Sequence, residues 1–200
     1  DTVAAYRQRN PQRFPVACGI VEPLHGTRSL GELERIKHEL KLQGVVWHSR
    51  FQGVAVDHQL MRPLLKKVSE LKLVPLIHTN AESNLEAVWR LERLALEFPE
   101  LTLVSLDALT TNTNSQLALD IAKRTPNILF DTAHVRGPAY VRQFVEAVGS
   151  RRLIFGSLFY SQPASYEHCA TIGEIKAAKI SDQDKANILA LNARALFGVA

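Results

Sequence analysis

The stretch Leu73–Asn80 reads L-V-P-L-I-H-T-N, an apolar run that ends in a histidine and two small polar residues. A continuous apolar run of this length is typical of a strand that is buried on both faces, as strands of parallel sheets are. Parallel α/β folds place their functional groups at the carboxyl ends of such strands. We therefore expect a buried strand that delivers His78 to any functional site of this protein.

Five further runs of this kind recur along the chain at intervals of 25 to 30 residues. Segments with the apolar spacing of amphipathic helices separate them, so strand and helix alternate. This alternation predicts a series of right-handed parallel β-α units. The predicted strands are Phe14–Val21, Gly44–His48, Leu73–His78, Leu101–Leu106, Asn127–Asp131 and Arg152–Ser157.

The length of these units favours an α/β fold of the (β/α)8 TIM-barrel type, in which one unit takes roughly thirty residues. Six strands are visible where a closed barrel needs eight, so we expect strands three to eight, with the first two units missing from this chain. An open doubly wound sheet could use six strands, but no glycine-rich loop follows any of them. Residues 1–200 are expected to form a single, incomplete barrel domain.

The sequence also predicts where several helices and loops lie. Residues 1–12 are typical of the end of a helix, and Ser29 with Glu32 has the spacing of a capping box at the start of another. Residues 49–57 are expected to form a loop. A helix around Tyr166–Ala178 and a last helix capped by Ser181 are expected to close the chain.

Composition limits the cellular setting and the partners. The chain is 46% apolar and 22% charged, which is typical of a globular domain. Its net charge is +4, but the longest basic runs are the pairs Lys66–Lys67 and Arg151–Arg152, too short for a nucleic-acid-binding stripe. Cys18 and Cys169 form no metal or disulfide motif, and no membrane span or signal peptide is visible. We expect a cytoplasmic protein that binds neither nucleic acid nor membrane.

Six motifs carry a resemblance to a known family. They are N-P-Q-R-F, G-V-V-W-H-S-R-F-Q-G, V-P-L-I-H-T-N, P-N-I-L-F-D-T, R-L-I-F-G-S and I-L-A-L-N-A-R-A-L-F-G, spread over nearly the whole chain. Together they resemble the amidohydrolase-related branch of the metal-dependent amidohydrolase superfamily, which includes lactone hydrolases and nonoxidative decarboxylases of muconate-type acids. The resemblance implies a distorted eightfold barrel with a divalent metal, expected to be zinc, at its mouth.

The same resemblance implies a ligand set that this chain carries only in part. The family has a His-x-His pair on its first strand, histidines on its fifth and sixth strands, and an aspartate after its eighth. The fifth-strand ligand falls on His78, whereas the sixth-strand histidine falls on Leu106 and the eighth-strand aspartate on Leu158. The His-x-His strand is expected to be absent from this chain. His78 is therefore the one expected metal ligand, and a metal-free site is the alternative.

Polar side chains at the other predicted strand ends are candidates for chemistry and substrate binding. Asp131 and His134 follow the same strand, where a carboxylate beside an imidazole can do acid-base work, although Asp131 could instead organise the turn. The second strand is followed by His48, Arg50 and Gln52. Because a guanidinium matches a carboxylate in bidentate fashion, these three could bind an anionic substrate, and a solvated loop is the alternative.

Three further residues complete the predicted substrate-binding set. Asp107 lies one residue beyond the position of the sixth-strand histidine, where a turn or helix-capping role is the alternative. Ser157 and Tyr160 are expected to line the mouth of the barrel.

Three functional hypotheses follow. The first is a metal-dependent hydrolase or nonoxidative decarboxylase that acts on a small carboxylate or lactone, with a small anionic substrate as ligand. The second is a catalytically degenerate barrel that acts as a binding or scaffold protein, because Leu106 and Leu158 can neither ligate a metal nor move a proton. The third is a metal-independent acid-base enzyme that uses Asp131 and His134. A homo-oligomer is expected in each case, as is common for such folds.

Overall fold

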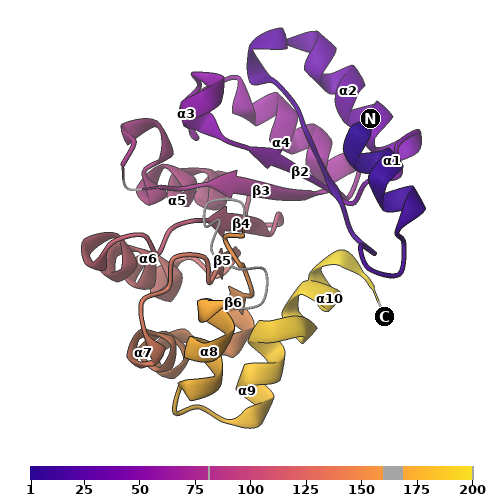
Figure 1. Ribbon diagram of the computed structural model, residues 1–200. Helices are drawn as coiled ribbons and strands as arrows, with labels where there is room; N and C mark the ends of the chain where they lie inside the picture. The colour runs from indigo at the N-terminus through magenta and orange to yellow at the C-terminus, as the bar shows by residue number, and fades with distance from the viewer. Residues whose placement is uncertain (81, 160–168, 200) are drawn as a thin grey trace.

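The protein is built around one parallel β-sheet. A computed structural model describes residues 1–80, 82–159 and 169–199 (Figure 1). The six strands of its sheet lie side by side in chain order, and every neighbouring pair is parallel. They are β1 (Cys18–Ile20), β2 (Gly44–Trp47), β3 (Val74–His78), β4 (Leu103–Leu106), β5 (Ile128–Asp131) and β6 (Leu153–Ile154).

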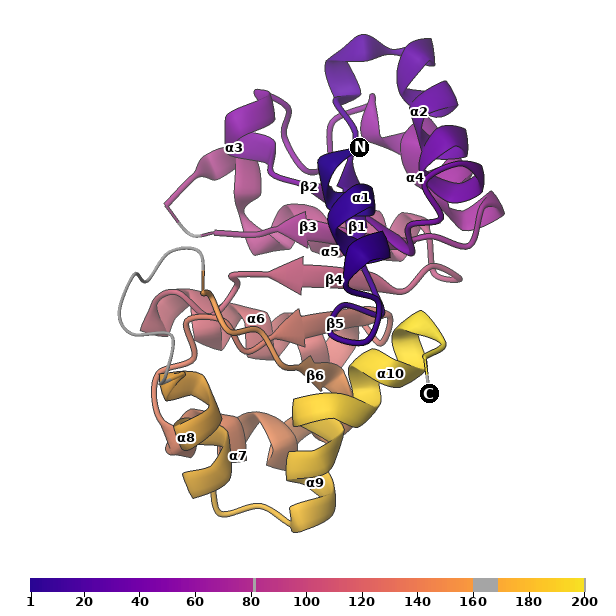
Figure 2. The same ribbon diagram turned by 45° about the vertical axis from the view of Figure 1, so that its right-hand side comes forward.

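Helices connect successive strands and contact one another in sequence. Contacts join α2 to α4, α5 to α6, α6 to α7 and α7 to α8, while α10 contacts β6 (Figure 2). The α-helices are α1 (Thr2–Arg9), α2 (Thr27–His38), α3 (Ser49–Gln52), α4 (Met61–Glu70), α5 (Val88–Glu97), α6 (Asn112–Arg124), α7 (Pro138–Val148), α8 (Ala170–Ala177), α9 (Asp182–Ala186) and α10 (Asn192–Phe197). Shorter turns are η1 (Pro23–His25), η2 (Asn84–Glu86), η3 (Ser150–Arg152) and the π-helical η4 (Asn187–Leu191).

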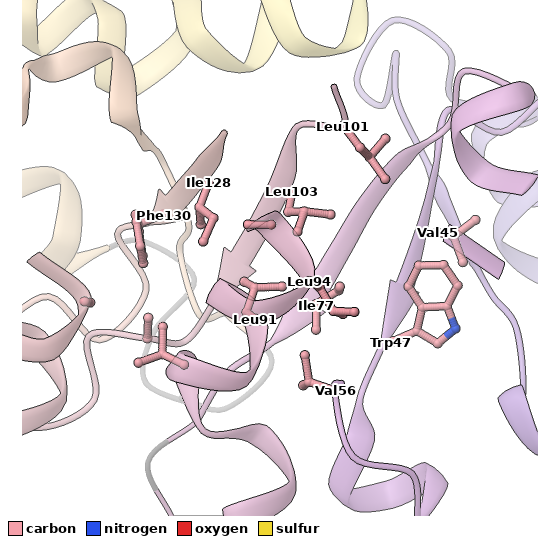
Figure 3. Close-up of a cluster of buried hydrophobic side chains, with 14 of the residues drawn as sticks. Val45, Trp47, Val56, Ile77, Leu91, Leu94, Leu101, Leu103, Ile128 and Phe130 are labelled. Atoms are coloured by element: carbon pink, nitrogen blue, oxygen red, sulfur yellow. The ribbon is translucent and has the colours of Figure 1, made fainter. Parts of the chain in front are cut away.

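The core forms where the apolar strand side chains meet the apolar faces of the helices. Trp47 of β2, Ile77 of β3 and Phe130 of β5 are fully buried, together with Leu91 and Leu94 of α5 (Figure 3). Burial of large side chains of this kind is the main stabilising contribution to folding. The sheet is thereby fixed, and so are the positions of its carboxyl-terminal loops.

All six observed strands lie within the predicted ranges, but the two outer ones are short. In β1 the sheet pairing covers only Cys18–Ile20. In β6 the ladder ends at Ile154, because the backbone N–H of Phe155 donates to the carbonyl of Ile188 in η4. The predicted strand Arg152–Ser157 was therefore too long by three residues at this end, and by one at its start, because Arg152 belongs to η3.

Two local predictions were wrong. The capping box at Ser29 does not form, because α2 already begins at Thr27 and the Ser29 hydroxyl donates to the carbonyl of Glu22, 2.6 Å away. The predicted loop 49–57 contains α3, which ends at Gly53 in the left-handed region with φ +65°. By contrast, Ser181 caps α9 as predicted, since its hydroxyl accepts from the N–H of Asp184.

In the part of the chain that the structure describes, no helix is both long enough and apolar enough to cross a membrane.

Candidate active site

A pocket of about 460 Å³ lies at the carboxyl ends of the central strands. Its wall is formed by residues that directly follow β2, β3, β4 and β5, where parallel folds gather functional groups. The lining residues are His48, Arg50, Phe51, Asn80, Glu82, Asp107, Thr110, Thr111, His134 and Arg136.

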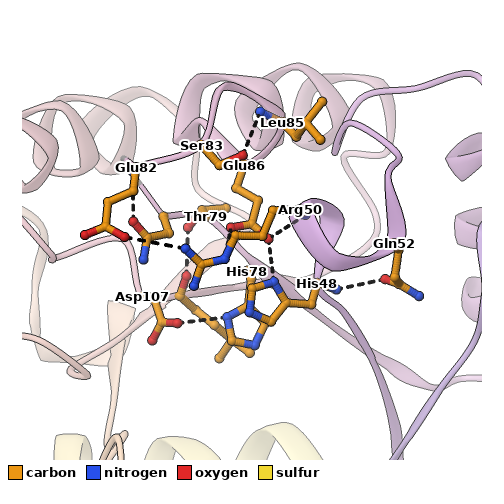
Figure 4. Close-up of polar contacts among 12 residues, drawn as sticks. His48, Arg50, Gln52, His78, Thr79, Glu82, Ser83, Leu85, Glu86 and Asp107 are labelled. Carbon is orange, nitrogen blue, oxygen red and sulfur yellow. Dashed lines mark hydrogen bonds and ion pairs between the residues drawn. The ribbon is translucent and has the colours of Figure 1, made fainter. Parts of the chain in front are cut away.

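His48 is held from behind by a buried glutamate. Its Nδ1 lies 2.6 Å from Oε1 of Glu86, a residue of η2 whose side chain is completely buried (Figure 4). Burial and the neighbouring His78 lower the pKa of His48, against the opposing effect of Glu86. Its backbone N–H donates to Oε1 of Gln52 over 2.9 Å, and Nε2 of Gln52 in turn donates to the carbonyl of Val21. The imidazole and the backbone N–H of His48 are therefore both held by hydrogen bonds.

Arg50 lies between two carboxylates. Its guanidinium is 3.6 Å from Oε2 of Glu86 and 3.5 Å from Oε2 of Glu82, and its backbone N–H donates to Glu86 (Figure 4). Glu86 thus joins two residues of the pocket wall, His48 and Arg50.

His78 and Asp107 form a second imidazole-carboxylate pair. Nδ1 of His78 lies 2.8 Å from Oδ2 of Asp107, and both side chains are buried. The ring of His78 stacks on that of His48 with centroids 3.9 Å apart and planes 12° from parallel. The prediction that His78 would stand at the carboxyl end of its strand is confirmed by β3, which ends at this residue.

Asp131 lies behind this pair. Its Oδ1 accepts from the backbone N–H of Asp107, 3.0 Å away, and a Cβ at Gly156 would lie only 2.5 Å from its Oδ2. Burial raises the pKa of Asp131 to about 8, and the charge of Asp107 adds to this, while hydrogen bonds from the backbone of Asp107 and Ala133 oppose it. Asp131 therefore holds a proton at neutral pH and supports the turn that carries Asp107.

His134 reaches the pocket from the loop between β5 and α7. Its Nε2 is 3.9 Å from Oδ1 of Asp107, and burial lowers its pKa, with the charge of Asp107 acting in the opposite direction. Both residues have backbone in the left-handed region, with φ +62° for Asp107 and +63° for His134. Backbone strain of this kind is typical of functional sites.

The structure brings four of the predicted site residues into the pocket wall, namely His48, Arg50, Asp107 and His134. Gln52, His78 and Asp131 stand directly behind them through the contacts described above. Ser157 is half-buried after β6, and Tyr160 lies outside the described residues.

The described residues do not form the ligand set that a family metal would need. Within residues 1–80, 82–159 and 169–199, no three His, Cys, Asp or Glu side chains are placed to hold one ion. Nδ1 of His78 is engaged by Asp107, and the two expected partner positions are hydrocarbon, Leu106 beside His78 in the sheet and Leu158 buried after β6.

Sequence reasoning did not identify Glu86, which organises one wall. Residues 83–86 read S-N-L-E, which has the spacing of a capping box, and the Ser83 hydroxyl does accept from the N–H of Leu85. The partner of Glu86 is 38 residues away, so no local signal links the carboxylate to His48. Asn80, Thr110 and Arg136 also line the pocket without having been predicted.

A sequence model of the amidohydrolase family matches residues 1–199. The chain belongs to this family. The resemblance noted from the motifs is therefore confirmed. No curated protein sequence matches the chain.

Solved structures of the family confirm the barrel. The 5-carboxyvanillate decarboxylase of Sphingomonas paucimobilis matches with a TM-score of 0.79 at 20% identity, over 100% of this chain and 71% of the other. A TIM-barrel protein of Bordetella bronchiseptica matches with a TM-score of 0.77 at 20% identity, over 98% and 71%. The six parallel strands are thus part of a TIM barrel, as predicted. These identities are too low to establish more than the fold.

A third similar structure contains a bound metal ion and an inhibitor. It is a dihydroxybenzoic acid decarboxylase of a Polaromonas species with bound manganese and the inhibitor 2-nitroresorcinol. It matches with a TM-score of 0.72 at 16% identity, over 99% of this chain and 73% of the other.

Proposed function

We propose that this amidohydrolase-family protein is an enzyme that acts on a small carboxylate or lactone, and that nonoxidative decarboxylation is the reaction its pocket supports best. One observation carries this proposal. Two imidazoles of the wall, His48 and His134, each lie near a carboxylate, and the same wall carries arginine side chains. Burial lowers the pKa of both imidazoles, which makes each a stronger acid once it is protonated, and the neighbouring carboxylate favours the protonated form.

Decarboxylation can proceed by proton transfer from such a group. A protonated imidazole gives its proton to the substrate carbon that bears the carboxylate, so that a C–H bond forms. The C–C bond to the carboxylate then breaks, its electron pair returns to the organic fragment, and CO2 leaves. Hydrolysis of a lactone would in addition need an activated water. The decarboxylases among the structural relatives support the same choice.

The test is CO2 release from a panel that includes 2,6-dihydroxybenzoate and 5-carboxyvanillate. We expect His134→Gln to lower kcat by about a hundredfold or more, the usual contribution of a positioned acid or base. His25→Gln, at an exposed position outside the pocket, should leave kcat unchanged. Equal rates in the two variants would contradict the role of His134.

The family resemblance implied zinc at His78, but the described residues supply too few ligands to hold it. We expect protein that is purified after zinc or manganese supplementation to contain well below one equivalent of either metal by elemental analysis. One equivalent that is lost in His78→Ala would restore the metal-dependent mechanism.

A binding or scaffold role is the second candidate, favoured by Leu106 and Leu158 at two expected ligand positions. It would give carboxylate binding without CO2 release or hydrolysis across the panel. A cytoplasmic location and a homo-oligomer are further proposals that fit either function.

A further inference from the structure

The two arginines of the pocket wall differ in how their charges are compensated. The guanidinium of Arg50 lies 3.5 and 3.6 Å from the carboxylates of Glu82 and Glu86. Glu86 is completely buried, and a buried carboxylate is strongly destabilising once a cationic partner is removed. Arg50 is therefore charge-paired with Glu82 and Glu86 before a substrate arrives, although its Nε and the Oε2 of Glu86 make no hydrogen bond among the described residues.

Arg136 has no such partner among the described residues. It follows β5, its side chain is exposed, and none of the ion pairs between described residues involves it. Its charge is close enough to His134 to contribute to the lowered pKa of that imidazole. Arg136 is thus a cation beside the proposed acid, still available to an anion.

The amino end of α6 lies on the same side of the pocket. Thr111 caps this helix of 13 residues, and Thr110 and Thr111 line the pocket with Arg136. A second hollow, of about 450 Å³, is lined by both Arg136 and Asn112, the first residue of α6. Arg136 and the amino end of α6 thus border the same two hollows, and the backbone dipoles at a helix amino terminus favour anions.

An unpartnered hydroxyl points to a ligand at this place. Thr110 is 6% exposed, and its Oγ1 has no hydrogen-bond partner among the described residues. Buried hydroxyl groups are nearly always hydrogen-bonded in folded proteins, so this donor lacks an acceptor that a bound oxyanion would supply.

We infer that the substrate carboxylate binds between Arg136, the Thr110 hydroxyl and the amino end of α6, and that Arg50 is not its counter-ion. This inference rests on the proposed function, because it takes the ligand to be a small carboxylate. A carboxylate bound there lies next to His134, which places the carbon that must accept the proton beside the proposed acid.

The test compares two ligands that differ only in the carboxylate, 2,6-dihydroxybenzoate and resorcinol, by calorimetric titration. We expect Arg136→Gln to weaken 2,6-dihydroxybenzoate binding by about ten- to a hundredfold, as for loss of a charge-assisted hydrogen bond, and to leave resorcinol binding unchanged. Thr110→Val, which keeps the shape of the side chain, should weaken the carboxylate alone by a smaller factor. Arg151→Gln is the matched control, because Arg151 is exposed in η3 and lines neither of these hollows, and it should change neither affinity.

Several results would overturn the subsite. They are equal affinity of the parent protein for the two ligands, no binding of the carboxylate, or a loss of carboxylate binding in Arg50→Gln that Arg136→Gln does not show. The same measurements distinguish a failure of the carboxylate subsite from a failure of the proposed enzyme activity. Carboxylate binding that depends on Arg136 without CO2 release supports the subsite and refutes the enzyme, whereas CO2 release with a KM unchanged in Arg136→Gln supports the enzyme and refutes the subsite.

Discussion

Glu82 and Glu86 both contact Arg50, but only one of them is buried. The Glu86 side chain is 0% exposed and that of Glu82 is 74% exposed. Replacing Glu86 by Ala leaves His48 and Arg50 without the carboxylate that they share inside the protein. We expect Glu86→Ala to lower the free energy of unfolding by about 3 kcal/mol.

Urea unfolding followed by circular dichroism measures this difference. Glu82→Ala is the matched control, because exposed ion pairs contribute little, and its midpoint should equal that of the parent protein. Equal midpoints for the two variants would mean that Glu86 does not hold the wall together.

Asp131 makes stability depend on pH in a direction opposite to that of most carboxylates. Its pKa is about 8 in the folded protein, against an ordinary value of 3.8. Between these values the folded chain keeps the proton and the unfolded chain has released it. Stability from this group is therefore complete below pH 4 and falls as the pH rises towards 8, by at most about 1.4 kcal/mol per pH unit.

The variant Asp131→Asn isolates this effect. An amide cannot ionise, so the difference in unfolding free energy between parent and variant should fall from pH 5 to pH 8. At pH 5 the variant is less stable than the parent, because its NH2 group cannot accept the backbone N–H that one carboxyl oxygen accepts. By pH 8 the parent has lost up to about 4 kcal/mol, which exceeds this difference. A difference that stays constant with pH would show that Asp131 is ionised in the folded protein.

At the scale of elements, the side chain of Asn192 links α10 to η3 and to β6. The amide of Asn192 donates to the carbonyls of Ser150 and Leu153, over 2.8 and 2.7 Å. These two contacts explain why the N-A-R-A-L-F-G motif begins with asparagine. Asn192→Ala leaves both carbonyls without this partner and should cost about 2 kcal/mol of unfolding free energy.

Thermal unfolding of Asn192→Ala beside Arg194→Ala tests this attachment. Arg194 is exposed on the same helix, so its replacement should leave the melting temperature close to that of the parent. A comparable loss in both variants would place the effect in the helix itself and not in its contact with β6.

The sequence was sufficient to predict the six strands, because a buried strand leaves a clear apolar signature, but it did not predict α3. The strand at Leu73–Asn80 carries that signature and lies between β2 and β4 in the sheet. The outer strands were predicted less well. The end of β6 depends on a hydrogen bond from Phe155 to Ile188, 33 residues away in the chain, which no local pattern contains.

The sequence predicted several of the residues that lie at the candidate site, but not which carboxylate pairs with which imidazole. Strand ends identified His48, Asp107 and His134, since parallel strands bring these loops together. The predicted pair was Asp131 with His134, whereas the observed ion pair of His134 is with Asp107. Which carboxylate faces which imidazole depends on the left-handed turn at Asp107 and on the burial of Glu86, and both are set by tertiary packing.

At the scale of the whole molecule, the described sheet has two outer strands, β1 and β6. The β1 edge carries exposed apolar side chains, with Ile20 71% exposed and Leu24 62% exposed. A hollow of about 280 Å³ lies beside it, lined mainly by apolar residues that include Ile36 and Leu42. Unpaired strand edges with apolar surface are prone to pair with another chain.

For residues 1–200 expressed alone, we expect self-association through β1 at micromolar concentration, with a molar mass by light scattering above the 22.3 kDa of one chain. Ile20→Lys places a charge on this edge and should shift the mass towards 22.3 kDa with unchanged circular dichroism. Leu96→Lys is the matched control, because Leu96 is 65% exposed on α5, away from the edge. If Leu96→Lys dissociates the assembly and Ile20→Lys does not, contact runs through the helical layer, and the edge of β1 is not what holds the copies together.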